Sequence, residues 1–254
     1  MKKKPSNLIL LTHKCGNMYF NKILKKEKSF IQFQSEDIRN GEMPGPSINK
    51  LKEISRPFYN ARCRNFDTIT TMKILDLVDA DRTQIFLCVR HPASFFRSAA
   101  KYHESKPEKW SQAQRYPHLD NQTLHEALAR EKDEDNKLII SMKHFGLAWR
   151  LPFRWVSNYE YIKSIGKEVT ILKTEDLFKN GTDSYFENTA EKMSHDGYSI
   201  NASRLIKASP ISLKTLPKHS TGEFQKDFFD GFGQKAIEFY NTHFKQIETF
   251  FYPL

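Results

Sequence analysis

A turn near the start of the chain combines a cation with a glycine directly after an apolar run. The run Asn7–Leu11 is followed by Lys14-Cys15-Gly16-Asn17. If a strand ends here and a helix begins, free backbone N–H groups and the Lys14 ammonium surround one small volume, which suits a phosphate-like anion. The Walker pattern of nucleotide triphosphatases is absent, because Lys14 precedes Gly16 and a second glycine is missing.

A second turn places an arginine where another phosphate could bind. Arg90 follows the continuous apolar run Ile85–Val89, and Ser98 comes eight residues later. Open α/β sheets bind ligands at the carboxyl ends of their strands, where an arginine fork and a serine hydroxyl can both donate to a phosphate. Two such turns at one sheet edge predict a nucleotide with two separated anionic groups.

These turns need strands and helices that alternate along the chain. Apolar spacing predicts a helix over Met18–Leu24, and Pro92 is suited to start a helix over Ala93–Tyr102. A third strand is predicted over Glu168–Lys173, after Gly166 as a helix stop. The alternation predicts a three-layer α/β fold, in which a central, mostly parallel sheet is flanked by helices.

The segments between these units differ in character. Glu36–Arg56 is predicted to be a loop because of its glycines and prolines, and Arg56–Cys63 is a possible strand. Glu104–Leu119 is polar with scattered aromatic residues, as lids and binding loops often are.

Three further patterns concern helices. Thr123 and Glu126 form a capping box that predicts the start of a helix. The charged run Arg130–Lys137 is expected to be a solvated helix face or a turn. The apolar spacing over Gln234–Phe251 predicts a closing amphipathic helix.

Length and composition favour one globular domain. The chain has 254 residues, of which 39% are hydrophobic and 13% aromatic, so it can bury a sizeable core. The net charge of +10 favours an anionic partner, such as nucleic acid, an acidic membrane, a polysaccharide or a phosphorylated ligand. The positive residues are spread along the chain, however, which is typical of a solvated surface.

The cysteines, histidines and apolar runs narrow the class of protein further. Cys15, Cys63 and Cys88 are odd in number and far apart, which excludes a disulfide framework and favours a reducing compartment. The histidines show no metal-ligand spacing, so no metal is expected. The run Leu8–Leu11 is short for a signal peptide, and no stretch approaches a membrane span. We therefore expect a soluble, cytoplasmic protein.

Four segments together resemble the sulfotransferases that use 3′-phosphoadenosine-5′-phosphosulfate (PAPS). Thr12–Tyr19 is similar to the family's P-K-S/A-G-T-T/S loop, and Arg90-His91-Pro92 with Ser98 is similar to its R-N/D-P motif and following serine. Thr174–Leu177 resembles the family's Y-E-D-L, and Gly222–Phe228 resembles its G-D/E-W-K-x-x-F segment, which covers the nucleotide. The segments occur in the family's order.

The resemblance implies a P-loop-like fold, a donor and a set of binding residues. It implies one sulfotransferase-like domain over residues 1–254, in which 104–145 form a lid or an acceptor-side insertion. The 3′ phosphate would be held by Arg90 and Ser98. The 5′ phosphosulfate would be held by Lys14, Cys15, Gly16, Asn17 and Met18. The implied reaction is in-line displacement at sulfur, with Lys14 stabilising the charge that develops on the bridging oxygen and 3′-phosphoadenosine-5′-phosphate (PAP) as product.

The chain departs from the family's pattern in three places. Asn17 and Met18 replace a pair of hydroxyl residues, so backbone N–H groups must bind more of the phosphate. His91 replaces Asn or Asp. The family's R-x-G before the last segment is not matched, and Lys218 and His219 are the nearest cations; we assign Lys218 to the 3′ phosphate.

The acceptor and the general base are less defined. The family usually uses His or Glu as base, and we select His103, with His13 as a further possibility; Arg62 and Arg64 could flank the sulfuryl group. The acceptor is expected to be a small molecule or glycan with a hydroxyl, and no nucleic-acid partner is expected. The sequence leaves the oligomeric state open.

Two alternatives remain. The first is a phosphotransferase with an atypical loop, and the missing Walker pattern and magnesium carboxylate argue against it. A basic polyanion or nucleic-acid binder would use the charge directly, although no recognition motif supports it. Added salt distinguishes a polyanion binder from an enzyme with a nucleotide pocket, because the affinity of a polyanion binder falls steeply with salt.

Overall fold

The computed structural model describes residues 6–12, 14–16, 30–34, 60–64, 67–77, 81, 83–105, 108–177, 182–194 and 227–253. The chain divides into two compact units. The first comprises Met1–Val89 and Ser157–Leu216, and the second comprises Arg90–Val156 and Pro217–Leu254. The single domain expected from the sequence stays a prediction.

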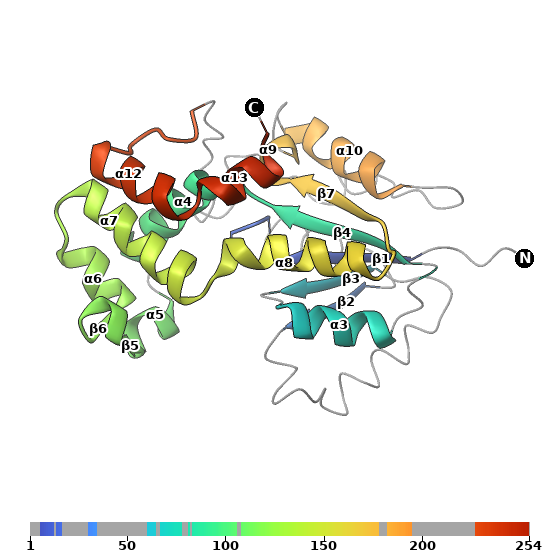
Figure 1. Ribbon diagram of the computed structural model, residues 1–254, viewed down its shortest axis with the longest axis horizontal. Helices are drawn as coiled ribbons and strands as arrows, with labels where there is room; N and C mark the ends of the chain where they lie inside the picture. The colour runs from blue at the N-terminus through green and yellow to red at the C-terminus, as the bar shows by residue number, and fades with distance from the viewer. Residues whose placement is uncertain are drawn as a thin grey trace, which may run out of the picture. The chain divides into compact units, whose positions relative to one another are not determined.

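The first unit is built on a five-stranded sheet with the order β2-β3-β1-β4-β7 (Figure 1). Its strands are β1 (Ser6–Leu11), β2 (Phe30–Gln34), β3 (Asn60–Arg64), β4 (Thr83–Val89) and β7 (Val169–Lys173). Every described strand pair in this sheet is parallel. The predicted fold class, a mostly parallel sheet flanked by helices, is therefore confirmed.

The burial of the strands follows their place in the sheet. Leu8–Leu11 in β1 and Ile85–Val89 in β4 are buried, as expected for central strands covered on both faces. In β7, at the edge, Val169–Ile171 are only half-buried. The Thr174 hydroxyl, just after β7, donates to the Val89 carbonyl at 2.9 Å and fixes the end of β4.

Helices complete the first unit. They are α3 (Thr68–Leu77), α9 (Thr174–Leu177), α10 (Thr182–Met193) and most of α8 (Leu151–Ser164), which has residues in both units. The sequence analysis did not predict α3. Its start is fixed by Asp67, whose carboxylate accepts a 2.7 Å bond from the Thr70 backbone N–H, as an N-cap residue does.

The second unit is mainly helical (Figure 1). Its helices are α4 (Pro92–Ser105), α5 (Lys109–Ala113), the 3-10 helix η3 (Pro117–Leu119), α6 (Leu124–Arg130), α7 (Glu134–Ser141), the π-helix η4 (Met142–Ala148), α12 (Gln234–His243) and α13 (Lys245–Phe251). A short hairpin joins β5 (Arg115–Tyr116) to β6 (Gln122–Thr123). α4 packs against α6 and α7, and α7 also packs against α12.

The structure confirms some local predictions in this unit. α4 begins at Pro92, and the Thr123–Glu126 capping box is present at the start of α6. Other predictions are wrong. The described residues of Glu104–Leu119 include the end of α4 and the short elements α5, β5 and η3 instead of a continuous loop, although the role of this segment as part of a lid stays a prediction. Gln234–Phe251 forms two helices instead of one, because helical geometry is interrupted at Phe244. The buried ring of Phe244 packs on that of Phe96, with centroids 4.6 Å apart.

Candidate functional site

The turn after β1 has an unusual backbone at the predicted phosphate-binding residues. Lys14 has φ +60° and Gly16 has φ +79°, with Cys15 between them at negative φ. A left-handed lysine is uncommon, and such strain gathers at functional sites. Such an alternation is typical of nests, turns whose main-chain N–H groups bind anions. The Cys15 backbone N–H donates to the Thr12 carbonyl at 3.3 Å and closes the turn.

Two buried side chains hydrogen-bond to each other within this turn. The Thr12 hydroxyl donates to Cys15 Sγ at 3.1 Å, and both residues are fully buried. Neither Cys15 nor Cys88 forms a disulfide. Burial raises the pKa of the Cys88 thiol, and the nearby Cys15 adds a smaller rise. Cys88 is therefore uncharged at neutral pH. Cys15 thus has a packing role in the turn, in addition to the hydrogen bond that its main-chain N–H donates to Thr12.

The second turn joins β4 to α4 and holds Arg90. The Arg90 Nε and Nη2 atoms donate to the Ser94 hydroxyl at 3.1 Å and 3.0 Å. Ser98 lies one helical turn beyond Ser94, and all three residues are buried. The sequence analysis selected Arg90 and Ser98 but not Ser94, although its spacing of four residues from each could have indicated its contact with Arg90. The two serines and the guanidinium form one polar strip at the start of α4.

The strands that precede the two turns, β1 and β4, lie next to each other in the sheet of the first unit. They are adjacent parallel strands, with Ile9 opposite Phe86 and Leu10 opposite Leu87. Arg62 and Arg64 are in the neighbouring strand β3, opposite Ile9 and Leu11. The carboxyl edge of a parallel sheet is where such folds bind ligands.

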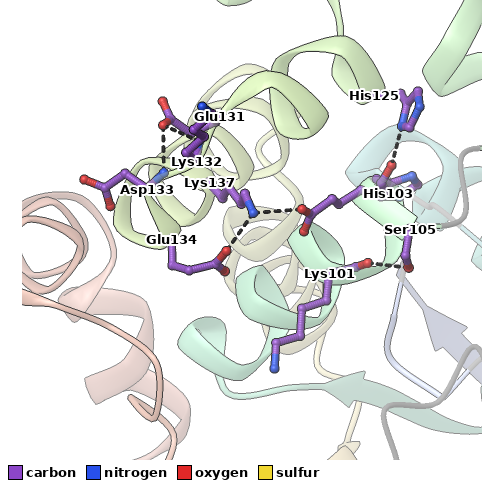
Figure 2. Close-up of polar contacts among 10 residues, drawn as sticks. Lys101, His103, Ser105, His125, Glu131, Lys132, Asp133, Glu134 and Lys137 are labelled. Atoms are coloured by element: carbon purple, nitrogen blue, oxygen red, sulfur yellow. Dashed lines mark hydrogen bonds and ion pairs between the residues drawn. The ribbon is translucent and has the colours of Figure 1, made fainter.

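His103, selected as a possible base, lies in the last turn of α4. Its ring is fully buried and packs against Trp110 at 4.9 Å and Phe145 at 5.3 Å. Its carbonyl accepts a bond from His125 Nδ1 at 3.1 Å, as Figure 2 shows. An acceptor could reach this imidazole only after the surrounding rings move. The catalytic role of His103 stays a prediction.

The charged run near α7 contains a structural ion pair. Lys137 Nζ lies 2.8 Å from Glu104 and 2.6 Å from Glu134, and these contacts raise its pKa (Figure 2). The Lys137 side chain is only 11% exposed. The expectation of a solvated face is therefore wrong for Lys137, which joins α7 to α4.

Two histidines that the sequence analysis did not select share a hydrogen bond. His118 Nε2, on η3, lies 3.0 Å from His144 Nδ1, on η4. His118 is exposed, whereas His144 is fully buried against Tyr116 and Trp149. Burial lowers the pKa of both rings, that of His144 to about 3 with a contribution from His118. His118 is an exposed neutral imidazole that is hydrogen-bonded to a second imidazole, and such a group can accept a proton. The pair is 26 residues apart, so local spacing could not reveal it.

Several predicted site residues lie outside the described residues. They are His13, Asn17, Met18, Lys218 and His219. Of the segment Gly222–Phe228, only its last two residues are described. The described ranges contain no group of three or more His, Cys, Asp or Glu side chains that could hold a metal ion. They also contain no helix long and apolar enough to cross a membrane.

Comparison with solved structures finds the crystal structure of the mouse sulfotransferase SULT7A1 complexed with PAP. The TM-score is 0.54, and the match covers 98% of this chain and 86% of that chain. The two proteins therefore share a fold. Sequence identity over the match is 13%, so the likeness concerns the fold alone. No family model and no curated protein sequence matches the chain.

Proposed function

We propose that this protein is a PAPS-dependent sulfotransferase. The observation that carries the proposal is the backbone at Lys14–Gly16, where a strained lysine and a left-handed glycine form a nest directly after β1. In sequence, the same turn resembles the 5′-phosphosulfate loop of the family named above. The Cys15 N–H closes the turn, and the other main-chain N–H groups of the turn would compensate for the hydroxyl residues that this chain lacks.

The Arg90 turn supports the second half of the proposal. Its guanidinium donates to Ser94, which leaves a planar cation held in one orientation at the start of a helix. A phosphate here would meet Arg90, the Ser98 hydroxyl and a helix N-terminus. We assign this turn to the 3′ phosphate, the group that distinguishes PAP and PAPS from other adenine nucleotides.

The proposed reaction moves one sulfuryl group. The acceptor oxygen forms a bond to sulfur while the bond from sulfur to the 5′-phosphate oxygen breaks, and the acceptor proton passes to a base. Lys14 stabilises the negative charge that develops on the departing phosphate oxygen. The acceptor is a small molecule or glycan with a hydroxyl.

Calorimetric titration with PAP tests the proposal, with ATP as the competing nucleotide. We expect PAP to bind more tightly than ATP. Arg90→Ala and Lys14→Ala should each weaken PAP binding by about tenfold or more, since each removes a charge-assisted contact worth roughly 1.5–3 kcal/mol. Lys101→Ala is the matched control, because it removes one positive charge from an exposed position on the same helix as the Arg90 turn.

The competing outcomes lead to different functions. Equal binding of PAP and ATP would favour a phosphotransferase. Binding that falls equally in all three variants, and collapses between about 50 and 200 mM salt, would favour a polyanion binder. Thermal unfolding of Arg90→Ala must accompany the titration, because Arg90 is buried.

A further inference from the structure

His91, the residue after Arg90, has its ring enclosed by residues from the C-terminal part of the second unit. The ring stacks on Phe228 with centroids 3.9 Å apart and planes 11° apart. Tyr252 contacts it edge-on at 5.1 Å, and its Nε2 lies 3.6 Å from Glu248 Oε2. His91 is only 2% exposed. An imidazole held by a face and an edge cannot rotate without moving these neighbours.

One carboxylate and two cations act on the charge of the ring. Glu248 is a buried carboxylate that accepts hydrogen bonds from the Tyr240 hydroxyl at 2.8 Å and from Lys245 Nζ at 2.5 Å. Burial lowers the pKa of His91 to about 4; Glu248 opposes this shift, and Lys245 and Arg90 add to it. At neutral pH the ring is therefore a neutral, flat surface for Phe228.

Phe228 belongs to a short turn that is attached at three points. This C-terminal turn, residues 227–233, stacks on His91 through Phe228 at its beginning. In its middle, Arg97 Nη1 donates to the Asp230 carbonyl at 2.5 Å. At its end, the Gly233 N–H donates to Asp135 Oδ1 at 2.5 Å. The last two attachments come from α4 and α7, so the turn lies along the helix that follows Arg90.

His91 also fixes the main chain from which Arg90 extends. Its carbonyl accepts a 2.9 Å bond from the Phe95 N–H, the hydrogen bond that opens α4. Its ring is immobilised by Phe228, and Arg90 is its covalent neighbour. A displacement of the ring would therefore turn the peptide between Arg90 and His91 and redirect the guanidinium. The resembled family has Asn or Asp at this position, and neither can stack on Phe228.

We infer that His91 is a positioning residue that couples the C-terminal turn to Arg90, and so sets the selectivity of this protein for a nucleotide 3′ phosphate. This inference rests on the proposed function. His91 does not touch the nucleotide in this scheme. It acts through the direction of the Arg90 side chain, and the stack on Phe228 is the contact that transmits the effect.

The experiment compares His91→Phe, which keeps a flat ring, with His91→Asn, which lacks one. Affinities for PAP and for adenosine 5′-monophosphate are measured by calorimetry, and their ratio gives the selectivity for the 3′ phosphate. His91→Asn should lower this ratio about threefold to tenfold, the loss expected from one aromatic pair. His91→Phe should keep it within about twofold. Arg97→Gln is the control, since it removes another attachment of the same turn and keeps the stack of His91 on Phe228.

Hydrogen exchange provides a readout that does not need the nucleotide. In His91→Asn, the amides of Phe229, Asp230 and Phe232 should exchange faster, while those of α7 should keep wild-type protection. Unchanged exchange would overturn the coupling whether or not PAP binds. Equal weakening of the binding of both nucleotides would also overturn the inference, because it would indicate a general loss of structure. Absence of PAP binding in the wild type would instead contradict the proposed function, and exchange would still test the contact between His91 and the turn.

Discussion

Gly146 occupies a position in η4 where two aromatic rings leave no room for a side chain. A Cβ atom at Gly146 would lie 2.6 Å from Cε1 of Phe244 and 2.9 Å from Cζ of Phe96. Carbon atoms in optimal contact are about 3.5–4.0 Å apart. Both rings are fully buried and pack on each other, so neither can retreat freely. Gly146→Ala should therefore cost about 3 kcal/mol of unfolding free energy, the upper end for overpacked cores.

Calorimetric melting and urea unfolding measure this cost. For a chain of this size, about 3 kcal/mol corresponds to a Tm lowered by roughly 6–12 °C. Leu147→Ala, at the exposed neighbour, should stay within about 0.5 kcal/mol of wild type. Phe244→Leu removes ring atoms that the new methyl group would meet, so the double variant should lose less stability than the sum of the two single changes. A Gly146→Ala protein that melts with the wild type, or strict additivity, would refute the reasoning.

Two further predictions concern stability. Asp135→Ala should lower the free energy of unfolding by about 0.5–2 kcal/mol, because its carboxylate accepts from Gly233 N–H and Ala236 N–H and so caps α12; urea unfolding beside the exposed control Glu238→Ala measures this. Lowering the pH should also destabilise the protein, because burial holds the pKa of His91 at about 4 and that of His144 at about 3, below the ordinary value of 6.5. The unfolded chain binds protons first as the pH falls below about 6.5, so each ring should cost up to about 2 kcal/mol by about pH 5. Urea midpoints at about pH 7 and about pH 5 test this: His91→Phe should lose less over that range, and a wild-type midpoint independent of pH would contradict it.

Continuous apolar runs made the centre of the sheet predictable. β1 and β4 are buried on both faces, so Leu8–Leu11 and Ile85–Val89 carry a signal that needs no context. Pro92 likewise marks the start of α4 by its own backbone restriction. α3 escaped prediction because threonines, which are not strong helix formers, occupy its first turn; its start depends on Asp67.

The parts of the site that sequence could not supply are contacts between distant segments. His118 and His144 meet only because η3 and η4 pack together. Phe228 reaches His91 from a distant part of the chain, and nothing in either local sequence specifies that stack. The left-handed backbone of Lys14 is also invisible in composition, since lysine has no preference for it.

The cap that Asp135 gives to α12 has a consequence for the order of folding. The carboxylate and the N–H group it accepts from are 98 residues apart, and Gly233 offers α12 no side-chain cap of its own. A contact of that span forms only after the loop between its ends has closed, which is slow and entropically costly. The first turn of α12 should thus gain protection late in refolding, after α7 is in place, and the two helices should unfold together as one cooperative element.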